Sequence, residues 1–71
     1  MKRLRDLRED NDLTQSDIAK ILSCSQTTYS RYEVGNLNIP GDALKKLAKY
    51  YNTSIDYLVG LTNDRKAYRR K

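Results

Sequence analysis

The chain has 71 residues, with 14 Lys and Arg against 9 Asp and Glu and a net charge of +5, which leaves room for one small domain with a single core. One cysteine excludes an intrachain disulfide, and without histidine a zinc site would depend on carboxylates. No apolar run approaches a membrane span and the N-terminus lacks a signal peptide's apolar centre, so we expect a cytoplasmic protein without metal or cofactor.

The excess positive charge is concentrated at one end of the chain. Residues 65–71, RKAYRRK, hold five of the fourteen basic residues, which leaves nine basic and nine acidic residues in 1–64. We therefore expect a folded domain over residues 1–60 and a flexible basic tail over 61–71. Residues 1–64 have no net charge. The affinity of the folded part for a polyanion must therefore come from a few specific contacts rather than from a net positive electrostatic potential.

Helical periodicity predicts a first helix over residues 2–10 and a second over 15–22. Thr14 is placed to cap the second helix, because its hydroxyl can accept from the backbone N–H of Asp17 while the Asp17 carboxylate returns the bond. The apolar residues of both helices are expected to face the core: Leu4, Leu7, Ile18, Ala19 and Leu22.

A turn at residues 23–24 leads to a third helix, expected from 26 to about 33 with Ser25 as its cap and Tyr29 and Tyr32 facing inward. Stacking of single-stranded nucleic acid on the tyrosines is the alternative, but core packing explains their spacing better. Cys24 falls in the turn and is expected to behave as a small buried hydrophobe.

Gly35 can end the third helix in a left-handed conformation, and residues 37–39 are expected to form a loop pinned by its apolar side chains. A fourth helix follows over residues 40–51, and a short fifth helix begins after the cap Ser54 and ends at Gly60. Apolar positions in these two helices are expected to face inward: Leu44, Leu47, Ala48, Tyr51, Ile55 and Leu58. The predicted fold is all-α, a compact five-helix bundle.

Three segments of the chain resemble one family. Residues 13–22, LTQSDIAKIL, are similar to the pattern LTQxxLAxxL of the phage repressor and Cro helix-turn-helix family, often called Xre-type. Residues 25–35 resemble its recognition-helix pattern SxxxISxxExG, with Tyr29 at the aliphatic position. Residues 52–60, NTSIDYLVG, resemble its closing helix. Three patterns in order at this spacing are specific, whereas one alone would be weak.

The resemblance extends from Leu4 to Gly60 and implies a lambda-repressor-like DNA-binding domain with its helix-turn-helix at residues 14–35. Two positions depart from the family pattern. Ser23 stands where the family usually has Gly, so either Ser23 adopts a positive φ or the turn differs. Ile21 lies on a face that is usually polar, where it indicates extra packing or a contact surface.

The outward row of the third helix supplies the expected base contacts: Gln26, Thr27, Ser30 and Arg31. Gln can pair with adenine through two hydrogen bonds, Thr can touch the thymine methyl, and Arg can bind guanine in bidentate fashion. Without the surrounding motif, the simpler interpretation is that these are solvated polar residues.

Phosphate contacts are implied by the resemblance for Gln15, and are expected for Thr28, Asn36 and, less securely, Lys45. Lys45 and its neighbouring lysines can equally be the solvated face of the fourth helix. Arg8 and Glu33 correspond to positions that form a buried ion pair in some members of the family. The alternative is that both are exposed and unrelated.

These features predict sequence-specific binding to double-stranded DNA by a transcriptional regulator, more specifically a repressor acting as a homodimer on a palindrome. The rival hypothesis is an interaction protein, such as an antitoxin or anti-repressor, whose main partner is another protein and whose DNA binding is secondary. An enzyme is disfavoured, since no nucleophile is paired with a base.

Overall fold

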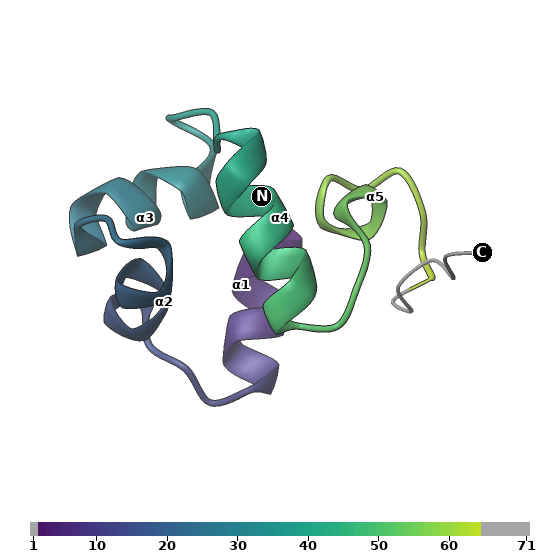
Figure 1. The fold of residues 1–71 in the computed structure, drawn as a ribbon, viewed down its shortest axis with the longest axis horizontal. Helices are drawn as coiled ribbons and strands as arrows, with labels where there is room; N and C mark the ends of the chain where they lie inside the picture. Colours follow the sequence, from purple (N-terminus) through teal and green to yellow (C-terminus); the bar gives the residue numbers. More distant parts are fainter. Residues whose placement is uncertain (1, 65–71) are drawn as a thin grey trace.

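The computed structural model describes residues 2–64, and these residues contain helices but no strand (Figure 1). The helices are α1 (Lys2–Asp10), α2 (Gln15–Leu22), α3 (Gln26–Val34), α4 (Gly41–Tyr50) and α5 (Ile55–Leu58). In Figure 1, α2 and α3 lie together at one end of the domain, α1 and α4 cross its middle, and α5 lies at the other end. The all-α prediction with five helices is confirmed for this part of the chain, and the predicted tail lies mostly outside it.

The starts of α2, α3 and α5 are fixed by side-chain caps, as the sequence predicts, whereas α4 begins after Pro40 without one. The Thr14 hydroxyl accepts from the Asp17 backbone N–H at 3.1 Å, and the Asp17 carboxylate accepts from the Thr14 N–H at 2.8 Å. Ser25 and Ser54 cap α3 and α5 in the same way, each through its hydroxyl. These caps satisfy N–H groups that have no partner inside the helix.

Several helix ends differ slightly from the prediction. α4 begins at Gly41 with Pro40 as its N-cap, and α5 ends at Leu58, before the expected Gly60. α3 includes Val34, one residue beyond the expected end, because the left-handed C-cap is Gly35 itself, with φ of 85°. α4 ends at Tyr50, and Tyr51 is its C-cap with its backbone N–H bonded to the Leu47 carbonyl at 2.9 Å. These shifts are of one or two residues, which is the usual ambiguity at a fraying end.

The core is a single cluster to which every helix contributes. Tyr29 is fully buried and is the largest such side chain, and its ring meets Tyr32 edge to face at 6.5 Å between centroids. The tyrosines of α3 are therefore core residues, as the spacing predicts. The buried hydrophobic residues are Leu4, Leu7, Ile18, Ala19, Tyr29, Tyr32, Leu47, Ala48 and Leu58.

Some expected core residues are covered less than predicted. Leu22 and Cys24 are only half-buried, because both line a hollow that opens between the α2–α3 end and the start of α4. Leu37 is 43% exposed, so the prediction that it pins its loop is wrong. The bend after Gly35 turns Leu37 to solvent, and Ile39 alone packs against the core from this loop.

Ser23 adopts the left-handed conformation that the family pattern assigns to Gly, with φ of 56° and ψ of 42°. Its backbone N–H is the capping donor of α2 and bonds to the carbonyls of Ala19 and Lys20. The turn is thus kept with a serine in it, at the conformational cost that a Cβ carries in this region. Ile21, the other departure, packs against the core.

Arg3 joins α1 to α5 and to the chain that follows it. Its guanidinium lies 4.2 Å from the Tyr57 ring centroid and donates to the Tyr57 carbonyl at 3.1 Å. It also donates to the Thr62 carbonyl and, at 2.6 Å, to Asn63 Oδ1. The first residues of the predicted tail segment therefore lie against α1, while residues 65–71 are outside the described part.

Candidate nucleic-acid interface

The two helices of the motif cross closely and present the N-terminal end of α3 at the surface. Ala19 is 3% exposed on the inner face of α2, where a small side chain allows α3 to approach. The backbone N–H of Cys24 bonds to the Ala19 carbonyl at 2.9 Å, which closes the turn tightly. Ser25 then starts α3 with its hydroxyl cap. The turn and the cap thus fix the direction of α3 relative to α2.

A surface hollow lies along the outer face of α3. Its lining consists of Gln15, Gln26, Thr27, Ser30, Arg31, Val34 and Asn36. Six of these seven residues are among the eight for which DNA contact is predicted from the sequence. The structure therefore brings all four predicted base-contacting residues together with two of the predicted phosphate contacts. Amide, hydroxyl and guanidinium groups offer the mixture of donors and acceptors that base edges present in the major groove.

The other two predicted phosphate contacts lie outside this hollow. Thr28 is half-buried, and its Oγ1 accepts a hydrogen bond from Ser25 Oγ at 2.9 Å. Its own hydroxyl hydrogen can still be donated to an anion. Lys45 is exposed on α4 and does not line the hollow.

Behind the hollow, Arg8 and Glu33 form an ion pair between α1 and α3. Arg8 Nε lies 2.6 Å from Glu33 Oε2, and Arg8 Nη2 lies 3.2 Å from Oε1. The side chains are only 14% and 4% exposed. Arg8 Nη1 also donates to the Leu13 carbonyl at 2.9 Å, so the loop between α1 and α2 is held by the same guanidinium. This geometry is that of a strong bidentate pair.

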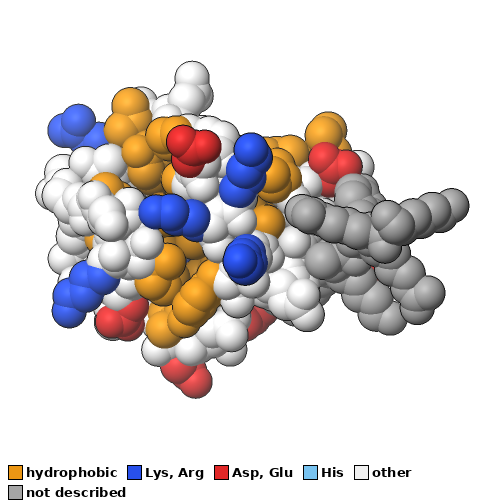
Figure 2. Space-filling view, in the orientation of Figure 1, with side chains coloured by type: hydrophobic (Ala, Val, Ile, Leu, Met, Phe, Trp, Pro, Cys, Tyr) orange, Lys and Arg blue, Asp and Glu red, His pale blue; other side chains and the backbone are white. Residues whose placement is uncertain are grey.

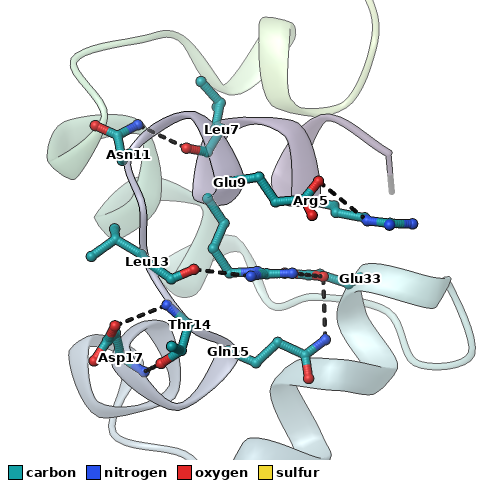
Figure 3. A network of polar contacts seen from close by, with 10 residues as sticks. Arg5, Leu7, Glu9, Asn11, Leu13, Thr14, Gln15, Asp17 and Glu33 are labelled. Atoms are coloured by element: carbon teal, nitrogen blue, oxygen red, sulfur yellow. Dashed lines mark hydrogen bonds and ion pairs between the residues drawn. The ribbon is translucent and has the colours of Figure 1, made fainter.

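Gln15 connects the ion pair to the hollow. Its Nε2 donates to Glu33 Oε1 at 3.3 Å, a contact that Figure 3 shows between the first turn of α2 and α3. The amide carries two N–H donors, so one remains for a ligand. Gln15 is half-buried and lines the hollow, and Glu33 thus sets where its amide points. The sequence alone gives no signal for this contact.

Burial and hydrogen bonding shift the pKa values of Glu33, Tyr29 and Tyr51. Burial works to raise the pKa of Glu33, but hydrogen bonds from Arg8 and Gln15 outweigh it and lower the pKa below the ordinary value. Burial, reinforced by the nearby Glu33 carboxylate, raises the pKa of Tyr29 above its usual range and that of Tyr51 to about 12. Glu33 is therefore a carboxylate, and both tyrosines are neutral, at physiological pH.

Val34 is a lining residue that the sequence patterns do not predict. It is 66% exposed at the end of α3. It follows Thr27 by seven positions and Arg31 by three, so it shares their face of the helix. This spacing could have identified it, since an exposed apolar side chain in the row can meet a thymine methyl or a sugar.

Neither a metal-binding cluster nor a membrane-spanning helix is found among the described residues. Figure 2 shows Lys and Arg side chains scattered over one face with Asp and Glu among them. Within residues 2–64, no three potential metal-ligating side chains gather closely enough to hold an ion. None of the helices in this part of the chain has the length and apolar character that a membrane span requires.

Comparison with known proteins gives consistent matches. The family model described as helix-turn-helix matches residues 4–58. The HTH-type transcriptional regulator YobD of Bacillus subtilis, itself called uncharacterized, is 38% identical over 63 residues, covering 89% of this chain and 56% of that protein. The cryptic phage CTXphi transcriptional repressor RstR of Vibrio cholerae is 37% identical, covering 80% of this chain and 51% of that protein.

A relative named as an antitoxin also matches. The antitoxin PezA of Streptococcus pneumoniae is 32% identical over 59 residues, covering 83% of this chain and 37% of that protein. The chain thus spans about half the length of YobD and RstR, and less of PezA. No solved structure matches the chain significantly.

Proposed function

The chain belongs to the helix-turn-helix family, and from this premise we propose that it binds double-stranded DNA sequence-specifically and regulates transcription as a repressor. The observation that carries the proposal is the hollow along α3, which gathers four predicted base-contacting side chains in one place. The similarity to YobD, named as a transcriptional regulator, and to RstR, named as a transcriptional repressor, supports the same function.

In the proposed complex, the N-terminal end of α3 enters the major groove. Gln26 and Thr27 lie in its first turn and read the nearest base edges, while Arg31, one turn further, binds guanine or a phosphate. Ser30 lies between them and contacts either. Each bidentate contact of this kind contributes roughly 1–3 kcal/mol of discrimination against a wrong base.

The phosphate contacts would position the domain without reading sequence. Gln15 donates its second amide N–H at the first turn of α2, where backbone N–H groups also favour an anion. Thr28 and Asn36 would contact the backbone beside α3, and Lys45 would add a more distant contact from α4. The Arg8–Glu33 pair would act indirectly, because it holds α3 and the Gln15 amide in place.

A homodimer on a palindromic operator completes the proposal, since two half-sites about one helical turn apart multiply both affinity and specificity. The surface around α5 is the proposed contact, because Val59 is 41% exposed and Leu61 is 77% exposed there. We place the protein in the cytoplasm, where its DNA would be, and assign it no catalytic activity.

The second candidate is a protein-interaction module of the antitoxin type, favoured by the match to PezA. Selection of bound DNA from a random duplex pool distinguishes the DNA-binding repressor from the protein-interaction module. A shared motif in the enriched pool would support sequence-specific binding, and enrichment without any motif would contradict it. Recovery of a stoichiometric protein partner, together with no DNA shift at low salt, would favour the second candidate.

A further inference from the structure

A second surface hollow adjoins the one along α3. It shares Gln15 and Val34 with the first, and α1 contributes Lys2, Arg5, Arg8 and Glu9 to its lining. The start of α1 therefore lies beside the end of α3, on the side of the molecule that presents the predicted base contacts. The two hollows thus border one another, and Lys2, Arg5 and Glu9 are not assigned to DNA by the sequence patterns.

The charge of the second hollow is carried by exposed side chains. Lys2 and Arg5 are both exposed. Arg5 Nε lies 3.4 Å from Glu9 Oε1 one turn along α1, and these side chains are 64% and 54% exposed (Figure 3). The remaining charges of this hollow, Arg8 and Glu33, neutralise one another in their buried pair. The accessible charge is therefore two cations against one carboxylate.

We propose that Lys2 and Arg5 form a phosphate-binding flank that extends the DNA interface from α3 onto α1. The inference rests on the proposed function, since the occupant of the flank is the backbone of the same duplex. Gln15 lies on the border of both hollows, so a strand whose phosphate meets Gln15 continues past the cations of α1. Such contacts add affinity that depends on salt but not on sequence.

The Glu9 carboxylate competes with DNA phosphates for Arg5. In the free protein its carboxylate pairs with Arg5, and on DNA a phosphate takes its place. Because the pair is exposed and solvent-screened, it exchanges at small cost. The Glu9 carboxylate also repels the incoming phosphate, so Glu9 lowers affinity for every sequence equally. Removing Lys2 or Arg5 and removing Glu9 should therefore change DNA affinity in opposite directions.

The test measures the salt dependence of binding by the whole chain to two duplexes. One is the duplex recovered by the wild-type protein from a random pool, and the other is a random-sequence duplex of equal length. The variants are Lys2→Gln/Arg5→Gln and Glu9→Gln. The control Lys20→Gln/Lys49→Gln removes the same charge from exposed positions that line neither hollow. Circular dichroism and thermal unfolding verify that each variant is folded.

The double variant of the flank should reduce the slope of log affinity against log salt by about 0.9 for each phosphate that the protein no longer neutralises, on both duplexes. When each of the two cations loses one phosphate, the ratio of the affinity at about 50 mM salt to that at about 200 mM becomes about tenfold smaller than for the wild type. Glu9→Gln should bind both duplexes about twofold to fivefold more tightly. The base preference of all variants should stay that of the wild type.

Equal slopes for the flank variant and its charge-matched control would overturn the flank while leaving the proposed function intact, because the wild type would still select its motif. A slope reduction confined to the selected duplex would also overturn it, since phosphate contacts do not read sequence. Failure of the wild type to bind any duplex would overturn the flank and the proposed function together.

Discussion

The Arg8 guanidinium holds the Glu33 carboxylate through two hydrogen bonds, Nε to Oε2 at 2.6 Å and Nη2 to Oε1 at 3.2 Å. Because Glu33 also accepts from Gln15 at 3.3 Å, this pair joins α1, α2 and α3 directly behind the surface that is proposed to read DNA. The geometry of that surface therefore depends on a buried polar cluster.

Arg8→Met should destabilise the domain by about 3–5 kcal/mol, because it leaves the Glu33 carboxylate buried without its cation. Urea unfolding measures the change. Arg5→Met on the same helix is the matched control: its partner Glu9 is exposed, so the loss should stay below about 1 kcal/mol. An Arg8→Met protein with an unchanged free energy of unfolding would show that the pair does not hold the fold.

Acid should destabilise the protein through Glu33. Its pKa in the folded protein lies below the ordinary value, so its contribution to stability is present above the unfolded pKa of about 4.3 and is lost as the pH falls through the lower folded value. Unfolding by urea at a series of pH values measures this loss. The double variant Arg8→Met/Glu33→Leu should lose less stability between neutral pH and about pH 3 than the wild type does. An equal loss in both proteins would assign the acid sensitivity to other groups.

Ser23→Gly should stabilise the domain by roughly 0.5–1 kcal/mol. Ser23 has φ of 56°, where a Cβ is strained and glycine is not, although the greater freedom of glycine in the unfolded chain offsets part of the gain. Ser23→Ala keeps the Cβ and should give no gain, which makes it the control in thermal unfolding. If Ser23→Gly proves less stable than Ser23→Ala, the left-handed turn is not strained.

Tyr51→Phe should leave stability at neutral pH unchanged or raise it slightly. The Tyr51 hydroxyl is buried and has no hydrogen-bond partner among residues 2–64, so its removal relieves a desolvation cost. The raised pKa of about 12 also means that wild-type stability is intact below the unfolded pKa of about 10 and declines as the pH rises toward the folded value. The variant should decline less between these values, and a parallel decline would exclude Tyr51 as a cause.

The features that the sequence predicts well are local ones. The caps at Thr14, Ser25 and Ser54 depend on residues three positions apart, so the helix starts could be read directly. The outward row of α3 follows from helical period alone, which is why its members are found together in one hollow.

The features that the sequence does not predict are contacts between distant segments. Arg3 meets Asn63 across 60 positions, and Gln15 meets Glu33 across 18. Neither residue type nor spacing signals such a pairing before the helices are placed. The exposure of Leu37 is unpredictable for a related reason, because the bend after Gly35 decides which side of the loop faces the core.

The central proposal, direct reading of bases by the outer row of α3, is tested most directly by repeating the DNA selection with Gln26→Ala and with Arg31→Ala. Asn38→Ala is the control, since Asn38 is exposed and lies outside the hollow. We expect each of the first two variants to lose base preference at one or two operator positions, by roughly 1–3 kcal/mol per bidentate contact, while the control keeps the wild-type motif. An unchanged motif in both α3 variants would contradict direct readout by this surface.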